Sequence, residues 1–115
     1  MEGDQSIIKI KAYLSGQFHL ADEQIESMIP GFITTLHCHM EKLETAVADK
    51  DPDMVRRAAH TIKGALLNLG LDECARMAAL LEEKGKSGDR TTEFKPLIDG
   101  LHHNLAPVFA FLFPG

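Results

Sequence analysis

The sequence predicts an all-α fold, an up-down antiparallel four-helix bundle with an accessory N-terminal helix. Apolar residues recur three and four positions apart along most of the 115-residue chain, which is the spacing of a helix face that packs on a core. Proline, glycine and aspartate residues divide this pattern into segments of helix length. The loops between these segments are short, so neighbouring helices must run antiparallel. No segment requires a β-strand.

Length and composition fit one domain over residues 1–115. The chain is 44% hydrophobic and 25% charged, as is usual for globular domains. Its net charge of −5 argues against a general nucleic-acid binder, and no apolar run is long enough to cross a membrane. The first residues lack the features of a signal peptide, so we expect a cytoplasmic protein. We interpret Cys38 and Cys74 as free, mostly buried thiols, with a disulfide as the alternative.

Two helices are predicted in the N-terminal half. A short amphipathic helix over residues 6–14 ends at Ser15-Gly16 and belongs to an N-terminal extension, residues 1–21. The bundle itself, residues 22–105, opens with a helix that Asp22 can cap. Proline lacks the N–H that a helix interior needs, so Pro30-Gly31 predicts that this helix is kinked or split.

The next two helices contain the candidate site. Asp51-Pro52 is a typical helix start, with aspartate as the cap and proline in the first helical position, and this helix ends at Gly70. Asp72 is the expected cap of the following helix, residues 73–84. Residues 85–88 read as a flexible turn. The residues of this fourth helix that we expect to face the core are Ala75, Met77, Ala78, Leu80 and Leu81.

The last helix and the residues after it are strongly apolar. Thr92 is the expected cap, and Pro96 lies in the first turn, where a missing N–H is tolerated. Pro107 should bend or end the helix, which leaves residues 106–115 as an apolar tail. We expect the tail to pack against the first helix, with an exposed dimer patch as the alternative. The apolar stripe of the last helix comprises Leu97, Leu101 and Leu105, with Ile98 alongside.

One helix carries a histidine on the face opposite its core residues. His60, Lys63, Gly64 and Leu67 share this face, because positions three and four apart lie on one side of a helix. Glycine in a helix costs about 1 kcal/mol relative to alanine. Its benefit at position 64 is access to the imidazole of His60. The core face of the same helix is formed by Val55, Ala59, Ile62, Leu66 and Leu69.

This stretch resembles the signature of histidine phosphotransfer (Hpt) domains, the four-helix bundles of bacterial and fungal phosphorelays. The family pattern is a His, a Lys three positions later, a Gly four later and a second Gly ten later. His60, Lys63, Gly64 and Gly70 match all four positions. The similarity extends more weakly over residues 22–105, through helix lengths and loop positions.

The resemblance implies that His60 accepts a phosphoryl group and passes it on. Histidine has an ordinary pKa near 6.5, so its nucleophilic neutral form dominates at cytoplasmic pH. The phosphoryl group carries about two negative charges, and Lys63 is the candidate cation. Arg56 and Arg57 add to this field or engage an acidic pocket of a partner. In the family a Gln or Glu 22 residues after the histidine lies beside its ring; here that residue is Glu82, which could also be a solvated surface residue.

The resemblance also implies the partners. They are response-regulator receiver domains and a sensor (hybrid) histidine kinase, which dock on a monomer. The chain has no glycine-rich phosphate loop for ATP, so we expect a phosphocarrier without kinase activity of its own and without a cofactor. The expected docking surface surrounds the histidine and comprises Arg56, Arg57, Gly64, Leu67, Asn68, Met28 and Phe32.

Two other functions fit parts of the sequence. His37-Cys38-His39 looks like a metal cluster, but neighbouring helix residues point about 100° apart. His37 and Glu41 do share a face, yet the paired Glu-x-x-His motifs of a di-iron bundle do not occur. The second alternative is a helical interaction module in which His60 is exposed by chance. We interpret the remaining histidines as surface residues: His19, His102 and His103.

Overall fold

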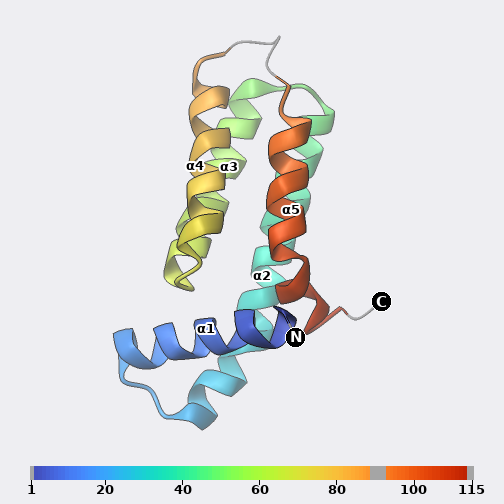
Figure 1. The fold of residues 1–115 in the computed structure, drawn as a ribbon. Coiled ribbons are helices and arrows are strands. Elements are labelled where there is room, and N and C mark those ends of the chain that lie inside the picture. The colour runs from blue at the N-terminus through green and yellow to red at the C-terminus, as the bar shows by residue number, and fades with distance from the viewer. Residues whose placement is uncertain (1, 89–92, 114–115) are drawn as a thin grey trace.

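The computed structural model describes residues 2–88 and 93–113, with side chains described from residue 7 onward. Within these ranges the chain is helical and contains no strand, so the all-α part of the predicted fold is confirmed. Figure 1 shows the helices. They are α1 (Glu2–Phe18), α2 (Asp22–Ala48), α3 (Pro52–Asn68), α4 (Asp72–Lys86) and α5 (Lys95–Ala110).

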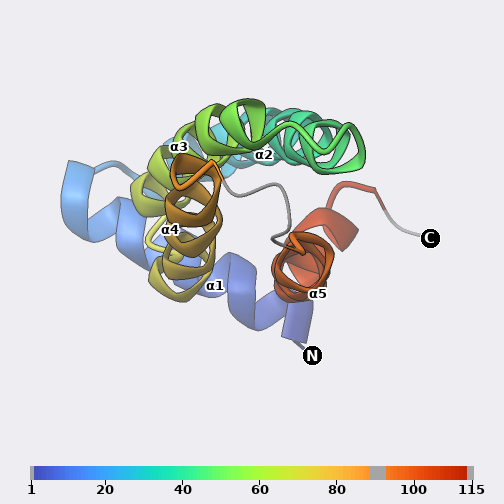
Figure 2. The same cartoon turned by 90° about the horizontal axis from the view of Figure 1, so that it is seen from above.

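Four of the helices lie side by side around a common core, and α1 crosses their lower end (Figure 1). Helix α3 contacts α2 and α4, and α5 also contacts α2 and α4, so each of the four has two neighbours. The view from above shows the same circuit, with α1 running beneath it to reach α5 (Figure 2). Helix α1 contacts α2 and α5. Helix α3, which carries His60, therefore has a packed helix on each side, α2 and α4.

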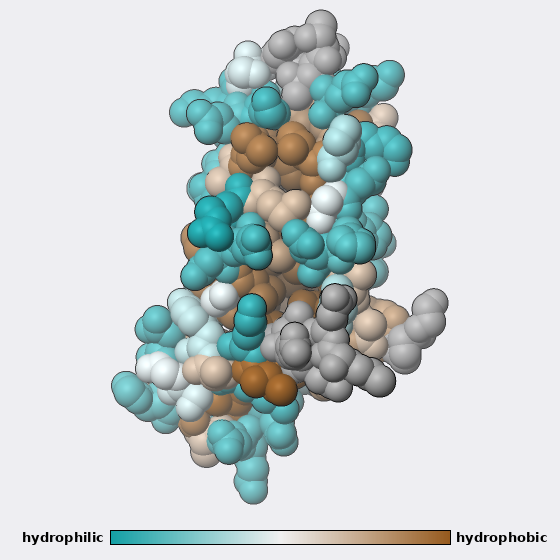
Figure 3. Space-filling model, viewed as in Figure 1, coloured by the Kyte–Doolittle hydropathy of each residue, from teal (hydrophilic) through white to brown (hydrophobic). Residues whose placement is uncertain are grey.

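The core consists of apolar side chains from all five helices. Every residue predicted for the core face of α3 is buried. On α4 the inward face is formed by Ala75, Ala78 and Leu81, whereas Leu80 is 44% exposed. The prediction that Leu80 faces the core is wrong, because Leu80 lies two positions from Ala78 and so points about 200° away from it around the helix. Apolar surface also shows between α4 and α5 in Figure 3. Met77 of α4 and Leu97 of α5, both predicted to face the core, are only partly buried against it.

The N-terminal helices are longer than the sequence predicts. Helix α1 continues through Ser15-Gly16 and ends at Phe18, followed by His19 with a φ of 52°. Helix α2 is not split at Pro30-Gly31. Its cap position is occupied by Ala21, whose N–H donates to the Gln24 side chain at 3.0 Å, so Asp22 is the first helical residue and not the cap. The missing N–H of Pro30 is outweighed by burial of apolar side chains on both sides of it, Ile25, Ile29 and Ile33.

The starts of the later helices agree only partly with the sequence. Asp51 caps α3 as predicted, accepting a hydrogen bond from Met54 N at 3.3 Å. Asp72 makes no capping bond, because Leu71 occupies the cap position of α4. Thr92 lies outside the described residues. Phe94 occupies the cap position of α5, and Pro96 is in the first turn as predicted.

The end of α5 differs from the predicted tail. Pro107 does not end the helix, which continues to Ala110. Val108 and Phe109 are buried, and α5 contacts α1 as expected. The rings of Phe109 and Phe113 also contact His37 of α2, with centroid separations of 5.2 and 4.6 Å. Packing on α1 and α2 together buries this segment only in part, since Phe113 stays 45% exposed.

Helix α1 is fixed to the turn between α3 and α4. Gly70 in this turn has a φ of 74°, which glycine adopts without strain and which terminates α3 as predicted. A Cβ atom at this position would overlap the ring of Tyr13 on α1. The close approach of Tyr13 therefore needs a residue without a side chain, so Gly70 serves both the turn and the docking of α1.

The cysteines are both free, but their burial differs. Cys74 is buried, and burial raises the pKa of its thiol. Cys38 is exposed, so the prediction of a buried thiol is wrong for this residue. None of the described helices is long and apolar enough to span a membrane.

Candidate functional site

His60 lies on the solvent-facing side of α3. Its side chain is 66% exposed, while the opposite side of the helix is packed in the core. Gly64 follows one turn later, and a Cβ atom built there would meet nothing within 4 Å. The approach to the imidazole is therefore open, as the sequence predicts.

A carboxylate from the neighbouring helix fixes one edge of the imidazole. Glu82 of α4 places Oε2 2.7 Å from Nδ1 of His60. Because Glu82 is ionised at neutral pH, this oxygen accepts, and the ring proton belongs on Nδ1. Within the described part of the chain, Nε2 has no hydrogen-bond partner. In the neutral form of this imidazole, the lone pair therefore belongs to Nε2, on the exposed edge of the ring.

The same carboxylate also binds Lys63. The Lys63 ammonium donates to Oε1 of Glu82 at 2.5 Å. The Glu82 side chain is only 21% exposed and that of Lys63 28%. The hydrogen bond from Lys63 holds the pKa of Glu82 below its usual value; partial burial opposes this effect and the bond with His60 adds to it. Sequence spacing places Lys63 beside His60, but it does not predict that Glu82 binds both.

The contact between α3 and α4 that aligns these side chains depends on Gly85. A Cβ atom at this position would lie 2.7 Å from the carbonyl oxygen of Pro52 and 2.8 Å from the backbone nitrogen of Arg56. The two backbones can approach this closely only because Gly85 has no side chain. The sequence assigns Gly85 to a flexible turn, which is wrong: it is a buried residue of α4, three positions after Glu82. Nothing in the local sequence distinguishes this packing glycine from a loop glycine.

Two arginines lie one turn before His60. Asp53 binds both, with its carboxylate oxygens 3.0 Å from Arg56 Nη2 and 3.1 Å from Arg57 Nε. The hydrogen bond from Arg56 is the main reason why the pKa of Asp53 lies below its usual value. Arg57 remains 64% exposed and Arg56 37%. Both guanidinium groups are therefore oriented on the surface of α3 and remain accessible to a partner.

The other residues of the expected docking surface are accessible to different degrees. Leu67 is 45% exposed and Asn68 is also exposed, both on the last turn of α3. Met28 is 38% exposed, whereas Phe32 is partly buried against the core. Both of these residues belong to α2, the helix that packs beside α3.

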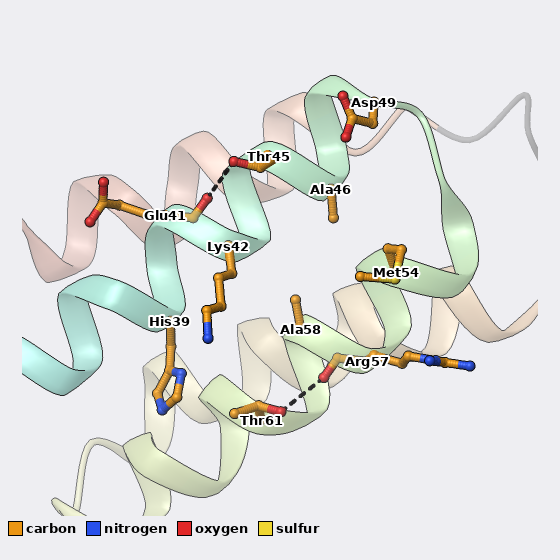
Figure 4. A pocket seen from close by; sticks show the side chains of 10 residues that line it. All are labelled: His39, Glu41, Lys42, Thr45, Ala46, Asp49, Met54, Arg57, Ala58 and Thr61. Atoms are coloured by element: carbon orange, nitrogen blue, oxygen red, sulfur yellow. Dashed lines mark hydrogen bonds between the residues drawn. The ribbon is translucent and has the colours of Figure 1, made fainter.

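A groove between α2 and α3 lies beside the site and was not predicted from the sequence. It has a volume of about 450 Å³, and its lining includes Thr61, the residue next to His60. Figure 4 shows Lys42 extending from α2 toward α3 and two alanines, Ala46 and Ala58, facing each other across the groove. The sequence feature that could predict this groove is the pair of alanines on the facing sides of α2 and α3, because alanine leaves the space between two helices unfilled.

The remaining histidines do not form a second centre in the described residues. His37 lies 3.3 Å from Glu41 and against phenylalanine rings of the C-terminal segment, while His39 lines the groove. No group of three His, Cys, Asp or Glu side chains in the described ranges could hold a metal ion. The three histidines predicted at the surface are exposed: His19, His102 and His103.

Comparison with known families agrees with this geometry. The family model described as the Hpt domain matches residues 27–106. The chain belongs to the Hpt domain family. No curated protein and no solved structure matches it. The matched part contains α3 and α4 and most of α2 and α5, whereas α1 lies before it. Hpt domains carry phosphohistidine in two-component phosphorelays, and the matched range includes His60.

Proposed function

We propose that this Hpt domain accepts a phosphoryl group on Nε2 of His60 from a receiver-domain aspartate or a kinase and passes it to another receiver domain. The observation that carries the proposal is the 2.7 Å contact between Glu82 Oε2 and His60 Nδ1. It leaves Nε2 as the free nitrogen of a side chain that is 66% exposed. An orienting carboxylate that fixes the tautomer of a reactive imidazole is a recurring catalytic arrangement.

The surrounding side chains support the transfer of an anionic group. Lys63 supplies a positive charge one turn from His60, and Gly64 leaves room for the incoming phosphorus. Arg56 and Arg57 extend the positive surface toward the start of α3. Such charges stabilise the phosphoryl group electrostatically, which is how proteins assist phosphoryl transfer when they perform little covalent chemistry themselves.

The partners follow from the same reasoning. The aspartate and the Mg²⁺ of the reaction belong to a receiver domain, and a sensor (hybrid) histidine kinase supplies phosphate to the relay. The receiver docks over Gly64, Leu67 and Asn68 and reaches Met28 and Phe32 on α2. The groove between α2 and α3 adjoins this surface and offers a place for an apolar side chain of the partner.

The arrangement of the helices fits this role. We infer that α2–α5 form the four-helix bundle of the family and that α1 is an accessory helix of a single domain. We further propose a monomeric cytoplasmic phosphocarrier without kinase activity of its own. A solvent-facing His60 then needs no second copy of the chain to complete the site.

A phosphorylation assay tests the proposal. The domain is incubated with a phosphorylated receiver, and the transferred label is tested for stability in alkali and loss in acid, as expected for phosphohistidine. Label should be present in the wild type and absent in His60→Gln. His103→Gln, which changes an exposed histidine of α5 outside the proposed docking surface, is the control and should accept label normally. Alkali-stable label on His60→Gln would contradict the assignment.

A further inference from the structure

Glu82 uses its two carboxylate oxygens for two different partners. Oε1 accepts from the Lys63 ammonium at 2.5 Å, and Oε2 lies 2.7 Å from His60 Nδ1. While the imidazole is neutral, Lys63 is the positively charged member of the cluster formed by Glu82, Lys63 and His60. In the unphosphorylated protein, the cation expected to meet the phosphoryl group is therefore already engaged by a carboxylate.

Phosphorylation changes which groups in this cluster are charged. The lone pair of His60 Nε2 forms the bond to phosphorus, the O–P bond of the receiver's aspartyl phosphate breaks, and its electron pair remains on the aspartate carboxylate. The ring keeps its proton on Nδ1 and so becomes a cation facing Glu82 Oε2. At the same time about two negative charges arrive at Nε2. Glu82 gains a second cationic partner just as a new anion appears beside Lys63.

We propose that Glu82 exchanges one cation for another during transfer. It holds the Lys63 ammonium while His60 is unmodified, and it releases that ammonium to the phosphoryl group once the charged ring of His60 compensates the carboxylate. This inference rests on the proposed phosphotransfer at His60. Glu82 is thus a positioning residue for both side chains, and it keeps a cationic partner throughout the reaction.

The geometry permits this exchange without movement of a helix. Lys63 and His60 lie one turn apart on α3, and the lysine ammonium sits on a flexible four-carbon stem. The Lys63 side chain is 28% exposed, so it is not locked in the core. Glu82 comes from α4 and stays fixed through Nδ1–H. Only the lysine rotamer has to change.

The exchange predicts an energetic coupling that depends on phosphorylation. Lys63 and Glu82 attract each other in the unphosphorylated protein, and this attraction weakens when Lys63 turns to the phosphoryl group. The equilibrium constant for phosphotransfer depends on the free-energy difference between the unphosphorylated and phosphorylated states. Loss of the attraction between Lys63 and Glu82 on phosphorylation therefore lowers this constant. If Lys63 instead bound both anions at once, the attraction would be the same in both states and would not appear in the equilibrium constant.

A double-mutant cycle tests the exchange. Wild type, Glu82→Gln, Lys63→Met and the double variant are each equilibrated with phosphorylated receiver, and the phosphotransfer equilibrium constant is measured. Gln keeps an oxygen for Nδ1–H but has no charge to hold Lys63. Glu82→Gln also removes the repulsion between Glu82 and the phosphoryl group. This effect is the same with Lys63 present and in the Lys63→Met background, so it cancels when the two fold-changes are compared. We expect Glu82→Gln to raise the constant about two- to five-fold more when Lys63 is present than in the Lys63→Met background.

Equal fold-changes in the two backgrounds, or a larger change without Lys63, would overturn the exchange. Circular dichroism checks that all four proteins fold. If the double variant does not, NMR of the Lys63 ammonium replaces the cycle: its resonance should differ between wild type and Glu82→Gln before phosphorylation and coincide afterwards. A difference that persists after phosphorylation would also overturn the exchange. Absence of label on wild-type His60 would instead contradict the proposed phosphotransfer itself.

Discussion

Protonation of Glu82 at low pH should weaken the contacts that hold the site together. The pKa of Glu82 is lowered in the folded protein, chiefly by Lys63. The ionised carboxylate therefore contributes stability that is fully present above its ordinary pKa of 4.5 and is lost as the pH falls through the folded value. Phosphotransfer between about pH 6 and 8 should consequently show no titration of Glu82.

Glu82→Gln tests this pH dependence. Wild type should exceed the variant in free energy of unfolding by about 1 kcal/mol near neutral pH, since the ion pair is only partly buried. The difference should stay constant down to about pH 5.5 and shrink as the solution becomes more acidic. Urea unfolding at a series of pH values gives both curves. A difference that grows toward low pH would have the wrong sign for a carboxylate with a lowered pKa.

Gly64 tests whether access to His60 limits transfer. Gly64→Ala should fold normally and gain up to about 1 kcal/mol of stability, because alanine is the better helix former and its Cβ meets nothing within 4 Å. Gly64→Gln carries a side chain long enough to cover the imidazole and should slow transfer about tenfold or more with an unchanged circular dichroism spectrum. Transfer from a phosphorylated receiver, stopped at a series of times, gives the rates for wild type and both variants. Wild-type rates for Gly64→Gln would mean that the glycine does not serve access.

At the scale of helices, the contact at Gly85 sets the position of Glu82 against α3. Gly85→Ala forces a Cβ atom onto the backbone of Pro52 and Arg56, so α4 must move away from α3. We expect a loss of about 1–3 kcal/mol in the free energy of unfolding and slower phosphotransfer, because Glu82 is drawn away from His60. Chemical unfolding and the transfer assay measure the two effects.

Gly31→Ala is the matched control, since Gly31 is also a helix glycine but a Cβ atom there meets nothing within 4 Å. This variant should be neutral or slightly stabilised. If both alanine variants behaved alike, the close approach at Gly85 would not be what aligns the two helices.

Helical periodicity predicts the elements and their core faces better than their boundaries. The core positions of α3 and the cap at Asp51 follow directly from spacing and residue type. A split at Pro30-Gly31 and a turn at Gly85 are both wrong, because the burial of Ile29 and Ile33 and the contact of Gly85 with Pro52 keep these segments helical. These tertiary contacts are invisible in a local sequence window.

In the candidate site, too, the residues on one helix face follow from the sequence, whereas the contacts between helices do not. His60, Lys63 and Gly64 are found on one exposed face, as their spacing requires. The position of Glu82 beside the ring came from the family resemblance and agrees with the structure. Its second bond to Lys63 and the groove between α2 and α3 depend on rotamers and on the separation of two helices, which spacing along one helix does not specify.

At the scale of the whole molecule, α1 is attached to the helices that carry the site through Tyr13 and Gly70. Gly70→Ala would meet two penalties, a positive φ of 74° and overlap with the Tyr13 ring. Gly88→Ala meets only the first, since Gly88 has a φ of 72° and open space around it. Gly70→Ala should therefore lose about 1–3 kcal/mol more than Gly88→Ala. Equal losses in the free energy of unfolding, measured by thermal or urea unfolding, would show that the packing of Tyr13 does not require a glycine at position 70.

We propose that Glu82 leaves Nε2 of His60 as the nitrogen that carries the phosphoryl group. NMR of the ¹⁵N-labelled imidazole, recorded before and after phosphorylation by a receiver, tests it most directly because it distinguishes the two ring nitrogens. The phosphoryl group should appear on Nε2 of His60, with the proton retained on Nδ1 toward Glu82. Phosphorylation of Nδ1, or of any other residue, would contradict this role of Glu82.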